Sequence, residues 1–77
     1  MTSLPVIESS EMLRALHRAR FYVHHQTGSH VRLFHKERLE LKVTLPVHNK
    51  DLPEKTLKSI MKQADLTVEE LIGLLKG

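Results

Sequence analysis

The chain has 77 residues, of which 40% are hydrophobic and 27% are charged, and this balance is typical of one folded domain rather than of a disordered tail. It has no cysteine, which excludes a disulfide scaffold, a thiolate metal site and thiol catalysis. Its formal net charge of +3 is compatible with a nucleic acid or an acidic protein as partner, and equally with the ordinary charge of a soluble surface.

A helix is predicted near the N-terminus. Residues 4–7 form an extended lead-in, because Pro5 disfavours helix in its predecessor. Ser9 or Ser10 can cap the helix, and Glu11 then lies in its first turn, where a negative charge is favourable. An apolar stripe at helical spacing follows, made of Met12, Leu13, Leu16 and Ala19. We therefore expect the helix to end at about Ala19.

Three strands are predicted after this helix. Residues 21–26 are rich in aromatic and β-branched side chains, residues 27–29 carry a turn signal, and residues 29–36 make the second strand. Residues 39–45 alternate strictly between apolar and polar, which is typical of a half-buried third strand. Pro46 then discourages further pairing.

The pairing of the first two strands can be predicted from their apolar residues. A two-residue turn would pair Val23 with Arg32, whereas a three-residue loop over residues 27–29, with a left-handed Gly28, pairs Val23 with Leu33. We favour the longer loop, which also sets His25 opposite Val31. The buried side of this hairpin then holds Phe21, Val23, Val31 and Leu33. Its open side holds Tyr22, His24, Gln26, His30, Arg32 and Phe34.

Two more helices are predicted in the C-terminal third. Pro53 suits a helix start, and an apolar stripe follows, made of Leu57, Ile60, Met61 and Ala64. Thr67 and Glu70 have the spacing of a capping box that opens a last helix over residues 68–75. The order α-β-β-β-α-α predicts an α+β fold in a single domain, residues 1–77, with the helices on one face of a three-stranded antiparallel sheet.

The open side of the sheet carries residues that could cleave RNA. A histidine such as His30 can accept or give a proton near neutral pH, and Arg32 and Lys36 on the same strand could hold a phosphate. RNA cleavage needs a base for the 2′-hydroxyl, cations for the phosphate and an acid for the 5′-oxygen. The alternative is that His30 only lies on a solvated strand.

Two further groups of residues, a pair of histidines and a row of lysines, could bind a metal ion and phosphates respectively. His24 and His25 are neighbours on one strand and are expected to point to opposite faces, and His24 and His30 could converge but have no third ligand on their face, so we predict no metal site. We also expect no cofactor. Basic residues also recur along the second predicted helix, at Lys55, Lys58 and Lys62, with Lys50 just upstream. These lysines could bind phosphates, or they could form the solvated face of an amphipathic helix.

Three stretches occur in the order and spacing of one known family. They are residues 21–30, which end in Gly28-Ser29-His30, then Leu45-Pro46-Val47-His48, then residues 56–64, which read Thr-Leu-Lys-Ser-Ile-Met-Lys-Gln-Ala. Over nearly its whole length the chain resembles the HicA-type toxins, the RNA-cleaving halves of bacterial toxin–antitoxin pairs.

The resemblance implies a function and a set of site residues. It implies a double-stranded-RNA-binding-like fold and endonucleolytic cleavage of messenger RNA without an obligatory metal, with His30 as the catalytic residue. We expect His24 and His48 to support His30, with His48 either orienting substrate or capping the following loop. The residues expected to contact RNA or its phosphates are Gly28, Ser29, Arg32, Lys36, Lys50, Lys55, Lys58 and Lys62.

The resemblance also implies partners. A HicB-type antitoxin would cover the basic surface around His30, and contact with DNA would occur only through that antitoxin. No apolar run approaches the length of a membrane span and the N-terminus lacks an apolar signal core, so we expect no membrane partner and a cytoplasmic location. Two other functions remain open: a non-catalytic RNA-binding module of the same fold, and a domain that binds an acidic protein.

The chain departs from the family at three positions where glycine is common, which are Arg20, Lys55 and Asp65. All three lie at element edges, where glycine permits a left-handed backbone or a helix end. Asp tolerates that conformation better than Arg or Lys. We therefore expect these positions to affect local stability rather than His30.

Overall fold

Three antiparallel strands form one open sheet with β2 (His30–His35) between β1 (Phe21–Thr27) and β3 (Lys42–Pro46). The structure is a computed structural model that describes residues 3–47 and 50–77. The helices are α1 (Ser9–Arg18), α2 (Glu54–Ala64) and α3 (Val68–Lys76). The predicted α+β fold and its element order α-β-β-β-α-α are confirmed.

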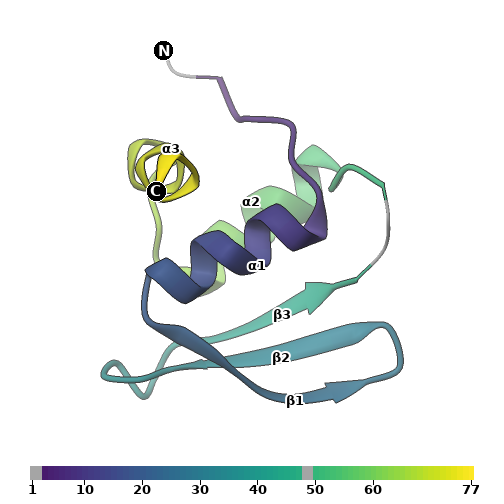
Figure 1. Ribbon diagram of the computed structural model, residues 1–77, viewed down its shortest axis with the longest axis vertical. Coiled ribbons are helices and arrows are strands. Elements are labelled where there is room, and N and C mark those ends of the chain that lie inside the picture. The colour runs from purple at the N-terminus through teal and green to yellow at the C-terminus, as the bar shows by residue number, and fades with distance from the viewer. Residues whose placement is uncertain (1–2, 48–49) are drawn as a thin grey trace.

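The helices lie on one side of the sheet (Figure 1). α1 contacts β1 and β3, α2 contacts β3, and α3 packs against α1, so that α3 lies farther from the sheet than the other two helices. The core between the layers is apolar, and its largest fully buried side chains are Phe21, Met12, Leu16, Leu33, Leu45, Leu57, Ile60, Leu71 and Val43. In the part of the chain that the structure describes, no helix covers the other side of the sheet. No helix there is long and apolar enough to cross a membrane.

The start of α1 differs from the prediction. Glu8 is the N-cap residue, and its backbone N–H donates to Oε1 of Glu11 at 3.0 Å. Ser9 is the first helical residue, and its hydroxyl donates instead to the carbonyl oxygen of Pro46 at 2.7 Å. The expectation that Ser9 or Ser10 caps the helix is therefore wrong, because the Ser9 hydroxyl is used to connect α1 to the end of β3.

The C-terminal helices follow their predictions. The α2 stripe of Leu57, Ile60, Met61 and Ala64 is buried, and Pro53 directly precedes the helix as its N-cap residue. At α3 the Glu70 N–H donates to Thr67 Oγ1 at 3.1 Å, and Glu70 Oε1 accepts from the Thr67 N–H at 2.9 Å. The predicted capping box is confirmed, and it explains why α3 begins directly after Thr67.

The hairpin between β1 and β2 has the predicted pairing at one end only. Val23 pairs with Leu33 as predicted, but the turn is formed by Gly28 and Ser29, and Thr27 pairs with His30. The register shifts between Val23 and His25, which is the mark of a β-bulge. The predicted three-residue loop is wrong. The turn has two residues, and the additional residue of β1 lies in the bulge between Val23 and His25 instead. His25 consequently pairs with Arg32 and not with Val31.

Two apolar residues expected in the sheet core are exposed. Val23 is 42% exposed, because β1 is an edge strand that extends from under the helices and only its first residue, Phe21, is buried. Leu39 is 76% exposed, because it lies in the turn before β3, which begins at Lys42 rather than at residue 39. The alternating pattern of residues 39–45 therefore predicts the third strand correctly, but the predicted strand begins three residues before the observed one.

Two of the three expected glycine positions have a left-handed backbone. Arg20 has φ +74° between α1 and β1, and Asp65 has φ +57° as the C-cap residue of α2. Lys55 lies inside the first turn of α2 and is not among the residues of positive φ. The strain expected from replacing glycine therefore falls on Arg20 and Asp65, and not on Lys55.

Candidate active site

His30 lies on the side of the sheet that the helices leave uncovered. It is the first residue of β2 and is exposed, whereas the next residue, Val31, is buried on the helix side. Alternation along the strand therefore places Arg32 and Phe34 on the same side as His30. Gly28, in the preceding turn, has φ +57°, and a Cβ added there would meet nothing within 4 Å. The turn needs glycine for its backbone conformation and not for space.

A small hollow of about 160 Å³ adjoins His30. Its walls come from all three strands and consist of His25, Thr27, His30, Val31, Arg32 and Thr44. The guanidinium of Arg32 is held from β3, because its Nη1 donates to Thr44 Oγ1 at 3.1 Å. Two imidazoles and one guanidinium thus surround a space suited to an anionic group such as a phosphate.

His24 and His25 lie on the same face of the sheet. Their Nδ1 atoms are 2.7 Å apart, and the His24 ring stacks on Phe34 with centroids 4.0 Å apart and planes at 15°. The expectation that these two histidines point to opposite faces is wrong, because the bulge interrupts the alternation of β1 at this point. The prediction from a regular strand could not include His25 in the site, since nothing in the period-two pattern marks the bulge.

Aromatic rings continue this surface beyond His24. Tyr22 is 37% exposed and meets Phe34 edge-on, with ring centroids 6.4 Å apart. The ammonium of Lys42 lies 5.2 Å from the centroid of the Phe34 ring. This uncovered side therefore offers stacking surfaces beside the cationic hollow, a combination that suits single-stranded nucleic acid.

Three other predicted residues lie near the hairpin but do not line the hollow. Gln26 pairs with Val31, so it lies on the side opposite to the expected one, and its amide donates to the Gly28 carbonyl at 3.1 Å. Ser29 is exposed and contributes its carbonyl oxygen to the Val47 N–H at 2.6 Å. Lys36 is exposed one residue beyond β2.

Four of the predicted lysines lie in the C-terminal half of the chain. Lys50, Lys55, Lys58 and Lys62 are all exposed, and none of them lines the hollow at His30. Lys58 and Lys62 border a different hollow of about 670 Å³, formed with the N-terminal segment and the start of α3. Lys58 also lies 3.9 Å from the Glu54 carboxylate one turn earlier. His48, the other predicted supporting residue, lies outside the described residues.

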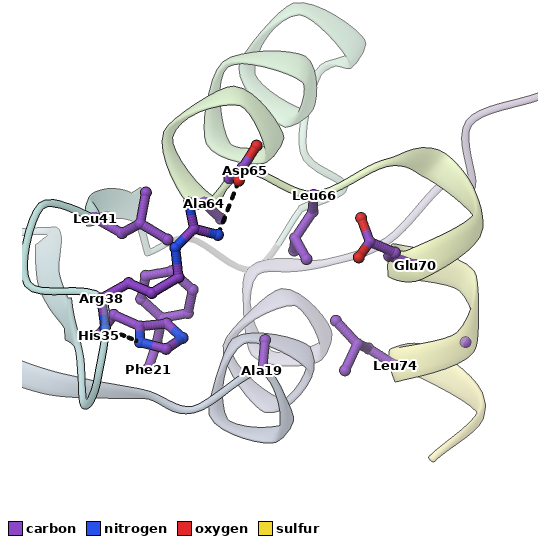
Figure 2. Close-up of a pocket in the computed structure, with 11 residues that line it drawn as sticks. Ala19, Phe21, His35, Arg38, Leu41, Ala64, Asp65, Leu66, Glu70 and Leu74 are labelled. Atoms are coloured by element: carbon purple, nitrogen blue, oxygen red, sulfur yellow. Dashed lines mark hydrogen bonds and ion pairs between the residues drawn. The ribbon is translucent and has the colours of Figure 1, made fainter.

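A third hollow, of about 420 Å³, opens between the ends of α1 and α2, α3 and the turn after β2, and Figure 2 shows its lining. Its histidine, His35, is buried, and the Nδ1 atom accepts from the backbone N–H groups of Glu37 at 3.0 Å and Arg38 at 2.8 Å. Arg38 Nη1 lies 2.8 Å from Asp65 Oδ2, and this hydrogen bond raises the pKa of Arg38 above its ordinary value. These polar groups bind one another, so this hollow has a structural role.

The described residues contain no cluster of three or more His, Asp or Glu side chains placed to hold a metal ion. The chemistry available at His30 is that of imidazole and guanidinium groups: proton transfer and stabilisation of anionic charge.

Residues 9–66 match the family model described as HicA toxin of bacterial toxin-antitoxin. The match extends from the first residue of α1 to just past α2 and includes the whole sheet. No curated protein matches the chain.

Proposed function

Because the chain belongs to the HicA toxin family and is the toxin of a toxin–antitoxin system, we propose that it is a metal-independent endoribonuclease that cleaves messenger RNA with His30 as its catalytic residue. The observation that carries the proposal is that His30 and Arg32 line one hollow on the uncovered side of the sheet. An imidazole beside a fixed guanidinium supplies the two functions that phosphodiester cleavage needs most, a proton acceptor and a cation for the phosphate.

In the proposed reaction the His30 imidazole accepts the proton of a ribose 2′-hydroxyl. The 2′-oxygen then forms a bond to phosphorus while the bond from phosphorus to the 5′-oxygen breaks and that oxygen takes up a proton from water or a protonated side chain, which gives a 2′,3′-cyclic phosphate and a 5′-hydroxyl end. Arg32 faces the negative charge on the non-bridging oxygens, and its bond to Thr44 holds the guanidinium in place without reorganisation during the reaction.

The remaining basic residues are proposed to bind RNA away from the scissile bond. Lys36 lies one residue beyond the end of β2, Lys50 lies in the connection after β3, and Lys55, Lys58 and Lys62 lie on α2. An RNA chain that reaches both His30 and the lysines of α2 has to pass around an edge of the sheet. These contacts would be sequence-independent and sensitive to salt.

Membership of the toxin family implies a cognate antitoxin. We infer that this antitoxin is of the HicB type and covers the surface around His30, where it would block access of RNA to the hollow. An acidic partner surface would complement the positive charge of Arg32 and Lys42.

A non-catalytic RNA-binding module is the second candidate, and the aromatic rings on the uncovered side of the sheet favour it. Tyr22 and Phe34 account for two of the three Phe and Tyr side chains of the protein, and they lie on the same uncovered side as Lys42. Stacking of bases on these rings would bind single-stranded RNA without any cleavage, and His30 would then be a contact residue only.

The decisive experiment incubates a long single-stranded RNA in EDTA with the intact protein, with His30→Ala and with His17→Ala. His17 is an exposed histidine of α1 on the other side of the sheet, so it is a matched control. The proposal expects cleavage by the intact protein and the control, and a loss of at least about a hundredfold in His30→Ala. RNA binding by all three without cleavage would favour the binding module, and cleavage by His30→Ala would reject His30 as the catalytic residue.

A further inference from the structure

We propose that His25 is the general acid of the reaction, which gives its proton to the 5′-oxygen while His30 accepts one from the 2′-hydroxyl, and that His24 positions His25. This inference rests on the proposed ribonuclease function and adds a second catalytic residue to it.

The first argument is the placement of the two imidazoles. His25 pairs with Arg32 and Thr27 pairs with His30, so His25 and His30 are diagonal neighbours on one face of an antiparallel pair. Diagonal neighbours have Cα atoms roughly 7–8 Å apart, within reach of two long side chains. His25 and His30 line the same hollow with Arg32. A phosphate in that hollow therefore has an imidazole from each of two strands available to its two reacting oxygens.

The second argument is that His25 is held in place. Its Nδ1 lies 2.7 Å from Nδ1 of His24, so one of the two nitrogens donates a proton and the other accepts it. The His24 ring is itself fixed by its stacking on Phe34. With Nδ1 used in this way, Nε2 is the nitrogen of His25 that remains for substrate. An acid whose ring is oriented by a second group is a recurring feature of proton-transfer sites.

The third argument assigns the roles of acid and base. An imidazolium donating to a neutral imidazole makes a charge-assisted hydrogen bond, and the contact between His24 and His25 has the geometry of such a bond. The charged and titratable groups that face His25 are His24 on its own strand, His30 and Arg32 on β2, and Lys42 on β3 at the Phe34 ring. We assign the donor role to His25 because of its hydrogen bond to His24, and the acceptor role to His30.

The step balances in atoms and charge. His30 gains the proton of the 2′-hydroxyl, the 2′-oxygen bonds to phosphorus, the bond from phosphorus to the 5′-oxygen breaks, and His25 gives its proton to that oxygen. One proton enters the protein and one leaves it, and exchange with water restores both histidines before the next turnover.

The test compares two oligoribonucleotides with a single cleavable linkage, one natural and one in which sulfur replaces the bridging 5′-oxygen. A thiolate leaves without protonation, so the sulfur substrate does not need a general acid. Rates are measured from pH 5 to pH 9 for the intact protein, His25→Ala, His30→Ala, His24→Phe, which keeps a stacked ring, and the control His17→Ala.

We expect His25→Ala to lose about a hundredfold or more on the natural substrate and to cleave the sulfur substrate at close to the intact rate. The decline of activity at high pH, which reports a required acid, should disappear in the same variant. His24→Phe should show a smaller loss with the same recovery on sulfur, and His30→Ala should remain inactive on both substrates.

Two results would overturn the inference and leave the proposed function standing. The first is natural-substrate cleavage by His25→Ala at the intact rate. The second is an equal loss on the natural and sulfur substrates, which would indicate a binding or structural role. Failure of the intact protein to cleave either substrate would instead reject the ribonuclease function, and the general acid with it.

Discussion

Gln63 Oε1 on α2 accepts a hydrogen bond of 2.9 Å from the backbone N–H of Thr44 on β3. β3 is an edge strand, and this N–H would otherwise have no partner in the sheet. On the other side of the same residue, Thr44 Oγ1 accepts from Arg32. The glutamine in the family-like stretch of residues 56–64 is therefore structural: it connects α2 to the strand residue that holds the proposed phosphate-binding arginine.

The first prediction concerns this connection. Gln63→Ala removes the acceptor of a half-buried N–H, and it should lower the free energy of unfolding by about 1–3 kcal/mol, measured by urea denaturation. Gln63→Glu keeps a side-chain oxygen at the same place and should lose less. Equal stability of Gln63→Ala and the intact protein would show that water replaces the amide without cost.

The second prediction concerns the two left-handed residues. Arg20 has φ +74°, and its side chain forms an exposed ion pair with Glu37, which contributes little to stability. Arg20→Gly removes the cost of a left-handed backbone at a non-glycine residue, about 1–2 kcal/mol. It also adds an entropic cost of about 0.5–1 kcal/mol, because glycine is more flexible in the unfolded chain. We expect a net gain of up to about 1.5 kcal/mol. Asp65→Gly should change stability less, because Asp tolerates this conformation and its carboxylate pairs with Arg38.

Lys55 is the matched control for these variants, since it occupies the third position where the family often has glycine. Lys55 is helical, so Lys55→Gly should destabilise the protein by roughly 0.5–1 kcal/mol. Thermal or urea unfolding of Arg20→Gly, Asp65→Gly and Lys55→Gly measures the three changes in stability, which can then be compared. A loss of stability in Arg20→Gly as large as that in Lys55→Gly would contradict the interpretation.

The elements of this fold could be predicted from local patterns, and the failures have a common cause. The α2 stripe and the capping box of Thr67 and Glu70 depend on neighbours in the chain, and both are confirmed. The cap of α1 depends on a distant carbonyl at Pro46, which takes the Ser9 hydroxyl. Tertiary contacts of this kind leave no local signal.

In the candidate site, too, the residue marked by a local motif could be predicted, and the residue placed by three-dimensional structure could not. His30 could be selected because Gly28-Ser29-His30 is a contiguous motif, and its exposure on the uncovered side agrees with the alternation of β2. His25 could not, because its position depends on a bulge that a regular strand pattern does not contain. Its proximity to His24 and the hollow becomes visible only in three dimensions.

The third prediction concerns pH. Histidine side chains titrate near pH 6.5 in model peptides, and a general base acts only when neutral. Cleavage should therefore fall as the pH decreases below about 6, because protonation removes the acceptor for the 2′-hydroxyl proton. Initial rates across pH 5 to 8 measure this, with circular dichroism at each pH as the control for folding. A flat profile would contradict a rate-limiting histidine base.

The last prediction separates the two groups of basic residues. Each lysine that neutralises a phosphate of single-stranded RNA contributes about −0.7 to the slope of log affinity against log salt concentration. Lys58 and Lys62 border a hollow on the helix side, away from the hollow at His30. If both contact RNA, the double variant Lys58→Gln, Lys62→Gln should reduce the slope by about 1.4, with the cleavage rate at saturating RNA unchanged. Binding is measured by fluorescence anisotropy with His30→Ala as the background, which prevents cleavage during the titration. An unchanged slope would mean that these two lysines belong to the solvated face of α2 and do not contact RNA.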